Sequence, residues 1–330
     1  MPISIVDDAS IAFNGAVLLG KNFACDAHYE RPVRIITHAH SDHLLNLTDS
    51  LRLCETILST PITKEIIAIL KEKELSSRIT TLQYEVPYEF EGERVILYPA
   101  HHIVGSAQVL VESKEGRRLL YTGDFKFPPA TPIKADIIVS EATYGNPAYV
   151  RSFRDSVESE LIKLVKTSLK KGPVYIFGYH GKLQEVVKLL NESDITAPIL
   201  VQEKVFRILQ VCRDYGMELS NFFHSDSYEG ELIMDSPHIG LYHMGASRWT
   251  FSEGVKIILS GWQFDVPCKR VGENEYQVAL SDHSDFEQLM EYFSASRPKL
   301  VITDNYRSGD APLLAREIKR RLNINAIAMP

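Results

Sequence analysis

The sequence predicts an α/β protein in which a second α/β domain is inserted into the first. Short apolar segments closed by polar loops recur through residues 1–145 and are typical of strands. Strand and helix patterns then alternate from residue 152, as in a small parallel sheet, and the earlier pattern returns near residue 277. An insertion explains this return better than two tandem domains. We expect a first domain in residues 1–150 and 271–330, and an inserted domain in residues 151–270.

The elements of the first domain follow from runs of apolar and β-branched residues between polar loops. Strands are expected at Gly15–Leu19, Val33–Ile36, Val95–Tyr98, Val109–Val111, Leu119–Tyr121 and Ile137–Val139, and a helix at Thr63–Glu74. The returning segment predicts strand Gln277–Leu280, helix Phe286–Phe293, strand Leu300–Ile302 and helix Pro312–Leu322.

The inserted domain begins with a long amphipathic pattern over Ser152–Lys171. Ser152 is its expected N-cap, and Gly172-Pro173 ends it. Further strands are expected at Val174–Phe177, Ile199–Val201 and Lys256–Leu259, with helices at Lys182–Asn191 and Lys204–Tyr215.

The composition is that of a globular protein with an acidic balance. The 330 residues carry a formal charge of −7, with 45% hydrophobic and 24% charged residues, which excludes disorder as the main state. A sequence pI of 5.9 excludes a general basic coat. Nucleic-acid binding would therefore require local positive charge or metal ions. The candidates for local charge are Lys126, Lys182, Lys269 and Arg270, although most lysines are simply solvated.

Cysteine usage and the first residues bear on the compartment. The 4 cysteines are far apart and form no C-x-x-C pair, which favours a reducing cytoplasm over a disulfide-stapled secreted fold. The N-terminal segment lacks the basic and apolar regions of a signal peptide, and no apolar run approaches the roughly 20 residues that span a bilayer. We expect an unexported cytoplasmic protein.

The densest group of candidate metal ligands directly follows the expected strand Val33–Ile36. It contains His38, His40, Asp42 and His43. Imidazole and carboxylate groups are natural zinc ligands, and such a cluster is difficult to bury without a cation. A chance surface cluster is the less favoured alternative.

Three further polar residues, His102, Asp124 and Glu141, each follow an apolar strand. Each alone has a structural explanation, because an Asp after Thr-Gly is commonly a turn residue and a single His is commonly structural. Together they favour a shared site, since ligands of α/β proteins gather outside the carboxyl ends of strands.

The histidine cluster resembles the H-x-H-x-D-H signature of the metallo-β-lactamase superfamily, with its later His at His102 rather than His101 and its bridging Asp at Asp124. Glu141-Ala142-Thr143-Tyr144-Gly145 is similar to the E-[SA]-T-[YF]-G segment of the β-CASP branch of nucleic-acid hydrolases. His102–Ala107 and Ser281–Asp285 resemble that branch's H-V-L-G-[SA]-A and S-x-H-x-D segments. The resemblance implies a metallo-β-lactamase αββα sandwich with an inserted β-CASP domain.

Within that branch the chain is similar to ligase-associated DNA exonucleases and to mRNA 3′-end processing factors. Gly178–Gln184 and Ser260-Gly261-Trp262 resemble the G-Y-x-x-G-K-x-Q and S-G-W segments of the former. One position departs from the family, because Thr303-Asp304-Asn305-Tyr306 stands where T-H-G-Y is usual. Carboxylates bind zinc and manganese, so the sequence favours Asp304 as a ligand of a second metal over an uncoordinated Asp.

The resemblance implies two divalent metal ions, with zinc preferred and manganese possible at the second site. The implied ligands are His38, His40 and His102 for the first ion, Asp42, His43 and Asp304 for the second, and Asp124 as the bridge. The implied catalytic residues are Asp42, Asp124, Glu141 and His283. Glu141 would hold His283, which protonates the leaving group. Asp26 resembles the family's first motif and would orient a ligand histidine, while a plain turn aspartate is the alternative.

The inserted domain contains the candidate substrate-binding residues. A glycine loop before a helix that begins at Lys182 is suited to phosphate, and Trp262 is suited to stacking on a base. Such loops are common, and Trp262 is equally compatible with a core position. The expected substrate-binding residues are Gly181, Lys182, Trp262 and Ser281.

We therefore expect a metal-dependent nuclease that hydrolyses phosphodiester bonds of DNA or RNA. The resemblance favours an exonuclease on single-stranded or end-exposed nucleic acid in repair or processing, with a DNA ligase or a helicase as candidate protein partners. The alternatives are an RNA-processing endonuclease of the polyadenylation-factor type and a catalytically silent scaffold subunit of a processing complex. A small-molecule hydrolase is less favoured, because it leaves the inserted domain unexplained.

Overall fold

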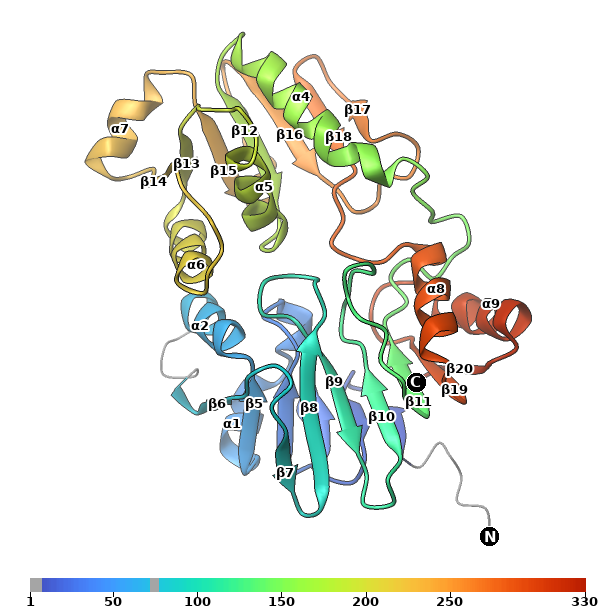
Figure 1. Cartoon of the computed structure of the whole chain (residues 1–330). Helices are drawn as coiled ribbons and strands as arrows, with labels where there is room; N and C mark the ends of the chain where they lie inside the picture. The colour runs from blue at the N-terminus through green and yellow to red at the C-terminus, as the bar shows by residue number, and fades with distance from the viewer. Residues whose placement is uncertain (1–7, 72–76) are drawn as a thin grey trace. The chain divides into compact units, whose positions relative to one another are not determined.

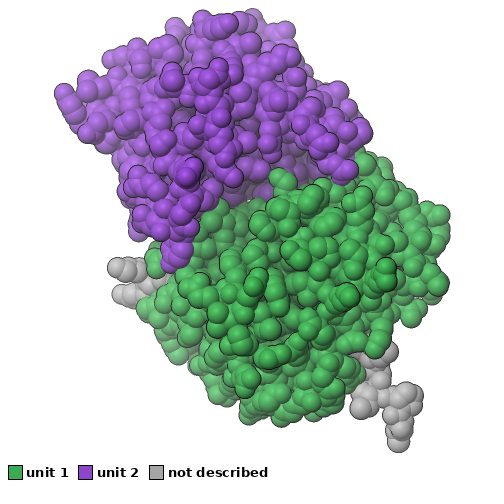
Figure 2. All heavy atoms as spheres, viewed as in Figure 1, with its two compact units in different colours: residues 1–150, 283–330 green, residues 151–282 purple. Residues whose placement is uncertain are grey.

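The computed structural model describes residues 8–71 and 77–330. The chain divides into two compact units, one made of residues 1–150 and 283–330 and the other of residues 151–282 (Figure 2). The two units share no sheet. Residues 1–7 lie outside the described residues. So does the last part of the expected helix Thr63–Glu74, beyond residue 71.

The first unit contains two sheets (Figure 1). The 6-stranded sheet has the order β1-β2-β3-β4-β5-β6, and its strands from β3 to β6 run parallel. Its strands are β1 (Ala9–Ile11), β2 (Val17–Leu19), β3 (Phe23–Cys25), β4 (Val33–Ile36), β5 (Thr56–Ser59) and β6 (Ile79–Thr81). Helices α1 (Leu47–Leu53) and α2 (Pro61–Leu70) lie beside β5 and β6.

The 7-stranded sheet of the first unit has the order β20-β19-β11-β10-β9-β8-β7. Its strands are β7 (Tyr88–Phe90), β8 (Glu93–Pro99), β9 (Ala107–Glu112), β10 (Arg118–Tyr121), β11 (Ile137–Ser140), β19 (Leu300–Asp304) and β20 (Asn325–Met329). Because β19 pairs in parallel with β11, the chain resumes the same sheet after residue 283. Helices α8 (Phe286–Ser296) and α9 (Ala311–Leu322) cover this sheet.

Alternation along the strands separates two cores in the first unit. Leu119 and Tyr121 of β10 belong to the core that both sheets share, whereas Leu120 packs with residues of α8 and α9. This is the two-residue period of a strand that is covered on both faces. The arrangement is a mixed α/β fold consistent with a metallo-β-lactamase-like fold.

The second unit is built on a 7-stranded sheet with the order β14-β13-β15-β12-β16-β18-β17. All its strand pairs are parallel except β17 with β18. The strands are β12 (Val174–Gly178), β13 (Ile199–Val201), β14 (Phe222–His224), β15 (Ile239–His243), β16 (Val255–Leu259), β17 (Cys268–Arg270) and β18 (Glu275–Val278). The helices are α4 (Val157–Leu169), α5 (Lys182–Asn191), α6 (Glu203–Asp214) and α7 (Tyr228–Met234).

Two expectations differ from the structure in this region. The chain does not return to the first unit at residue 271, because β18 pairs in parallel with β16 and so extends the second unit to residue 282. The long helix also begins later than Ser152. A 3₁₀ turn (Arg154–Ser156) precedes α4, and the Ser156 hydroxyl donates to the Phe153 carbonyl at 2.8 Å instead of capping the helix.

The structure also shows the state of the cysteines and the character of the helices. All four cysteines, Cys25, Cys54, Cys212 and Cys268, carry free thiols. Among the described residues, no helix combines the length and the apolar character needed to cross a bilayer.

Candidate metal centre

The loop after β4 places several histidines at the end of a buried strand. Val33 and Ile35 are fully buried in the core that both sheets share, which fixes the strand up to Ile36. The chain then continues through His38 and His40 into a 3₁₀ turn (Ser41–His43). The loop is therefore anchored at its first residue by the core and at its last by a closed turn.

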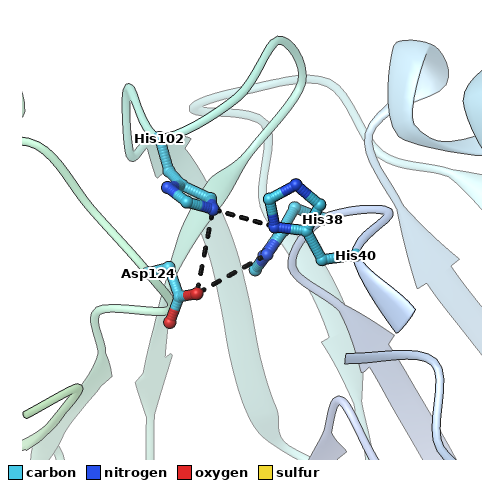
Figure 3. A group of neighbouring side chains, drawn as sticks. All are labelled: His38, His40, His102 and Asp124. Carbon is cyan, nitrogen blue, oxygen red and sulfur yellow. Dashed lines mark hydrogen bonds and ion pairs between the residues drawn. The ribbon is translucent and has the colours of Figure 1, made fainter. Parts of the chain in front are cut away.

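Four side chains converge from both sheets of the first unit (Figure 3). His38, His40, His102 and Asp124 each offer a ligand atom, and these atoms all lie within 4.8 Å of one another. His102 Nε2 lies 3.0 Å from His40 Nδ1, and the Nε2 atoms of His38 and His102 each lie 3.8 Å from Asp124 Oδ2. Three imidazoles and one carboxylate are a suitable ligand set for a divalent ion such as zinc.

Asp42 and His43 extend this cluster, and the His43 ring lies beside that of His38 with ring centroids 4.0 Å apart. His43 Nε2 lies 3.3 Å from Asp124 Oδ2 and 3.5 Å from Asp42 Oδ2. The Asp42 side chain is 58% exposed, so this carboxylate opens to solvent. Burial opposes ionisation, but the nearby His43 ring and its charge outweigh this and lower the pKa of Asp42 to about 2.

The outer nitrogens of two rings are held by neighbours, which leaves the inner nitrogens facing Asp124. Thr37 Oγ1 lies 3.0 Å from His38 Nδ1, and Asp26 Oδ2 lies 2.7 Å from His43 Nδ1. Within the described part of the chain, the buried Nε2 atoms of His38 and His43 have no hydrogen-bond partner. Such orphaned buried atoms are rare and call for an explanation. These residues therefore fit a divalent metal ion.

The electrostatics of the histidines differ with their neighbours. Burial, together with the nearby His43 and His102 rings, holds the pKa of His38 well below its usual value. Burial acts the same way on His43, but the charges of Asp124 and Asp26 outweigh it and raise its pKa well above the usual value. Metal ligation requires the neutral imidazole, so loading His43 with a metal would release a proton.

Asp26 holds His43 from behind the cluster. It is fully buried with a left-handed backbone (φ 65°), and its carboxylate accepts hydrogen bonds from Thr37 N at 2.8 Å and from the Thr37 hydroxyl. Burial opposes ionisation, but the charge and hydrogen bond of His43 lower the pKa of Asp26. The carboxylate thereby selects the tautomer in which His43 Nε2 can bind a metal.

Asp26→Asn is expected to weaken metal binding about 10- to 100-fold while the fold persists. The amide can donate its own N–H to His43 Nδ1, which moves the ring proton to Nε2 and blocks the metal-facing lone pair. Metal affinity measured by competition with a chromogenic chelator checks this, with the exposed Asp155→Asn as the matched control. Equal affinities for both variants would contradict the positioning role of Asp26.

A glycine turn presents Asp124. Gly123 has φ 56°, and a Cβ at this position would lie 2.9 Å from the Ala107 carbonyl oxygen. Only glycine fits this left-handed, crowded position. Asp124 is itself buried, and although burial opposes ionisation, the charge of His43 holds its pKa well below the usual value.

Glu141 and His283 form a second pair beside Asp124. Glu141 Oε2 lies 2.7 Å from His283 Nδ1, and Glu141 Oε1 accepts a hydrogen bond from Phe125 N at 2.8 Å. Ser284 N and its hydroxyl donate to the Phe125 carbonyl at 2.9 and 3.0 Å. Burial raises the pKa of Glu141 despite the opposing charge of His283. Asp124, Glu141 and His283 each offer an atom within 4.8 Å of the others, so the pair adjoins the metal-ligand cluster.

Asp304 at the end of β19 is engaged by its own loop. Asp304 Oδ2 accepts a hydrogen bond from Arg307 Nη1 at 2.7 Å, and Oδ1 accepts from Tyr306 N at 2.8 Å and Arg307 N at 3.3 Å. The Asp304 side chain is 1% exposed and that of Arg307 is 9% exposed. The carboxylate expected as a metal ligand thus lies in a buried ion pair.

The candidate substrate-binding residues lie in the second unit. Lys182 Nζ lies 2.8 Å from Asp282 Oδ1, with both side chains buried. Gly181 N donates to the Gln184 side-chain oxygen at 2.6 Å, while Trp262 is 53% exposed. Ser281 is half-buried directly before Asp282. Lys182 and Gly181 therefore have structural partners, and the exposed Trp262 ring is not a core residue.

Lys182→Ala is expected to lower the free energy of unfolding by about 3–5 kcal/mol, because it leaves Asp282 charged and buried without this partner. Lys188→Ala on the same helix is the matched control, since its pair with Glu192 is exposed and is expected to contribute less than about 1 kcal/mol. Urea unfolding measures both. Equal losses would show that the Lys182 pair is not a structural support.

The sequence analysis did not identify several residues that support the site through hydrogen bonds to its loops. Arg34 is fully buried and donates to Ser50 Oγ at 2.8 Å, to the Asp26 carbonyl at 2.6 Å and to the His43 carbonyl at 3.4 Å. Desolvation lowers its pKa to about 10. A charged residue inside the apolar strand Val33–Ile36 was the available signal. Ser284 and Thr37 carried no comparable signal, since their roles depend on contacts made in the folded chain.

The fold and this site define a mixed α/β protein with a buried His/Asp cluster suited to a metal ion. The chain matches no protein-family model. It is 39% identical over 138 residues to an "uncharacterized protein in lig 3′ region" of Acidianus ambivalens. This alignment covers 41% of this chain and 99% of that protein. It is also 29% identical over 293 residues to a probable DNA ligase of Opitutus terrae, covering 84% of this chain and 27% of the ligase.

The chain is also similar to a DNA cross-link repair protein and to a solved structure. The chain is 26% identical over 305 residues to the DNA cross-link repair protein SNM1 of Arabidopsis thaliana, covering 84% of this chain and 60% of SNM1. A crystal structure of a protein of unknown function from Enterococcus faecalis V583 shares the fold, with a TM-score of 0.60 at 13% identity over 82% of this chain and 74% of that one. The chain spans less than two thirds of the ligase and of SNM1.

The chain belongs to the β-CASP branch of the metallo-β-lactamase superfamily.

Proposed function

We propose that this protein is a metal-dependent nuclease that hydrolyses phosphodiester bonds of DNA or RNA. The observation that carries the proposal is the cluster of buried His38, His102 and Asp124 with half-buried His40, beside the Glu141–His283 pair. The cluster offers ligands for a metal, and the pair offers a proton donor at hydrogen-bond distance from a buried carboxylate. Membership of the β-CASP branch and the similarity to the DNA cross-link repair protein SNM1 support this chemistry.

The proposed ligands divide between two ion positions, with zinc preferred and manganese possible at the second. His38, His40 and His102 serve the first position, Asp42 and His43 the second, and Asp124 lies between them. A divalent ion bound here supplies positive charge that polarises the phosphate and lowers the pKa of water. The buried donor atoms and their orienting partners, Asp26 and Thr37, support this division.

His283 is the proposed general acid and Glu141 its positioning partner. The Glu141 carboxylate fixes the Nδ1 side of the ring and stabilises the imidazolium, so that Nε2 can hold the proton for the leaving oxygen. The Phe125 backbone ties the two residues together, because Phe125 N bonds Glu141 and its carbonyl accepts from Ser284.

The second unit is the proposed β-CASP insertion, over residues 151–282 as the structure divides the chain. Its parallel sheet and the exposed Trp262 ring suit a nucleic-acid-binding module, with Trp262 available for base stacking. The relatives named for a ligase and for a lig 3′ region favour a DNA end as substrate and a DNA ligase as partner, in an exonuclease role in repair.

End-labelled single-stranded DNA and RNA of one sequence, incubated with zinc or manganese, test this function. Wild type is expected to give a ladder or mononucleotides, whereas Asp42→Ala gives none. The exposed Glu65→Ala variant is the matched control and is expected to cleave like wild type. Internal fragments without a ladder would favour the endonuclease alternative. Absence of cleavage by a protein that carries its metal would favour the scaffold alternative and overturn the proposal.

A further inference from the structure

The loop after β19 contains an ion pair that is largely shielded from solvent, with side chains 1% exposed at Asp304 and 9% at Arg307. Asp304 uses both oxygens within this loop, Oδ2 toward Arg307 Nη1 at 2.7 Å and Oδ1 toward Tyr306 N at 2.8 Å and Arg307 N at 3.3 Å. Metal ligation by Asp304 would require one of these oxygens to give up its partner. That would leave either a buried guanidinium without its carboxylate or a backbone N–H without an acceptor, and both losses are costly.

Arg307 also reaches the loop that carries the proposed ligands of the second ion position. Its Nη2 atom lies 3.4 Å from the Asp42 carbonyl oxygen and 3.3 Å from the Gly15 carbonyl oxygen. The guanidinium therefore lies between the end of β19 and the Ser41–His43 turn. Asp304 itself follows Thr303, which pairs with Ser140 directly before Glu141, so it stands at the same sheet edge as the site.

We propose that Arg307 occupies the place from which a protein ligand would otherwise reach the second ion, and that it binds no metal itself. Resting on the proposed function, this means that Asp304 binds no metal and that only Asp42, His43 and Asp124 hold the second ion. The first ion is bound tightly by buried donors, while the second is bound weakly and exchanges with solvent on the open side of Asp42.

Charge and ligand count both support this weakness. Arginine stays protonated at all relevant pH values, so the guanidinium repels a divalent ion placed beside Asp42 and His43. Affinity for a divalent ion also rises with the number of charged ligands. A free Asp304 would add one carboxylate, whereas the Arg307 pair cancels that charge. The Asp42 carboxylate, with its side chain 58% exposed, then provides the open side of the position.

Metal binding measured without activity tests the inference. Protein is loaded with zinc, dialysed, and analysed for zinc by mass spectrometry, and Mn²⁺ is then titrated while free Mn²⁺ is followed by electron paramagnetic resonance. Wild type is expected to retain about one zinc per chain and to bind one further Mn²⁺ weakly. The double variant Asp304→Asn/Arg307→Met removes both charges of the ion pair, so the net charge beside the second position stays that of wild type. It is expected to match wild type in both measurements.

Arg307 variants give the converse result. Arg307→Met frees the Asp304 carboxylate and is expected to tighten Mn²⁺ binding about tenfold or more. Arg307→Lys retains the positive charge and is the matched control, with Mn²⁺ binding like wild type. Thermal unfolding of each variant shows whether it is folded.

Two results would overturn the inference. One is loss of Mn²⁺ binding in Asp304→Asn/Arg307→Met, which would make Asp304 a ligand. This variant leaves no unpaired charge of the ion pair, so it decides the matter even if Arg307→Met does not fold. The other is unchanged Mn²⁺ affinity in folded Arg307→Met. A wild type that binds neither zinc nor Mn²⁺ would instead contradict the proposed function itself.

Discussion

Asp124→Asn is expected to reduce nuclease activity by more than about 10³-fold and to lower metal content at the same time. Asp124 Oδ2 lies between 3.3 and 3.8 Å from the Nε2 atoms of His38, His43 and His102, so it is the carboxylate that links the two groups of histidines. The isosteric amide removes its negative charge, which leaves the converging imidazoles without a counter-charge for a divalent cation. Initial rates on end-labelled single-stranded DNA, with zinc analysis of the same samples, measure both effects.

The control for Asp124→Asn is Asp214→Asn, an exposed aspartate at the end of α6. It is expected to leave rate and metal content unchanged. If Asp124→Asn retained full metal content and full activity, the assignment of Asp124 as the link between two ion positions would be wrong.

His283→Ala is expected to reduce kcat about 10²- to 10⁴-fold while metal content stays at the wild-type level. His283 is placed by Glu141 at 2.7 Å and contributes a proton rather than a ligand in the proposed mechanism. A single-turnover assay on the same substrate, combined with zinc analysis, separates the chemical step from metal loss. A parallel fall in zinc would assign His283 to the metal instead.

Glu141→Gln tests the same pair through its pH dependence. The activity of a general acid falls as pH rises and its proton is lost. Because Gln supplies no negative charge to the imidazolium, the alkaline limb of the pH–rate profile is expected to move to lower pH in Glu141→Gln. An unmoved limb with a reduced rate would indicate that Glu141 only supports the Phe125 turn through its 2.8 Å hydrogen bond.

The strand-end pattern predicted much of the site. β4 has the expected bounds, and side chains after β4, β8, β10 and β11 lie close together because the carboxyl ends of these strands gather at one place. Helix α5 also has the expected bounds, since its amphipathic period and its flanking Gly181 are local signals. Such predictions succeed when the deciding interactions lie within a few residues of each other.

The return of the chain to the first unit was placed too early for a non-local reason. The apolar run near residue 277 correctly indicated a strand, but no local feature says which sheet a strand joins. β18 pairs in parallel with β16, and in this register Leu259 lies opposite Val278. Strand partners depend on packing between distant segments, so only the folded chain settles them.

By itself, the sequence determined the identity and the order of the metal-ligand candidates. The reason is that side-chain chemistry and the ends of apolar strands can both be recognised from residues next to one another in the chain. Only the tertiary structure decided which charged groups neutralise one another. Lys182 meets Asp282 across the second unit, and Asp304 is buried with Arg307 rather than left free. The physical reason is that the cost of burying a charge depends on the whole surrounding structure, which no short stretch of sequence specifies.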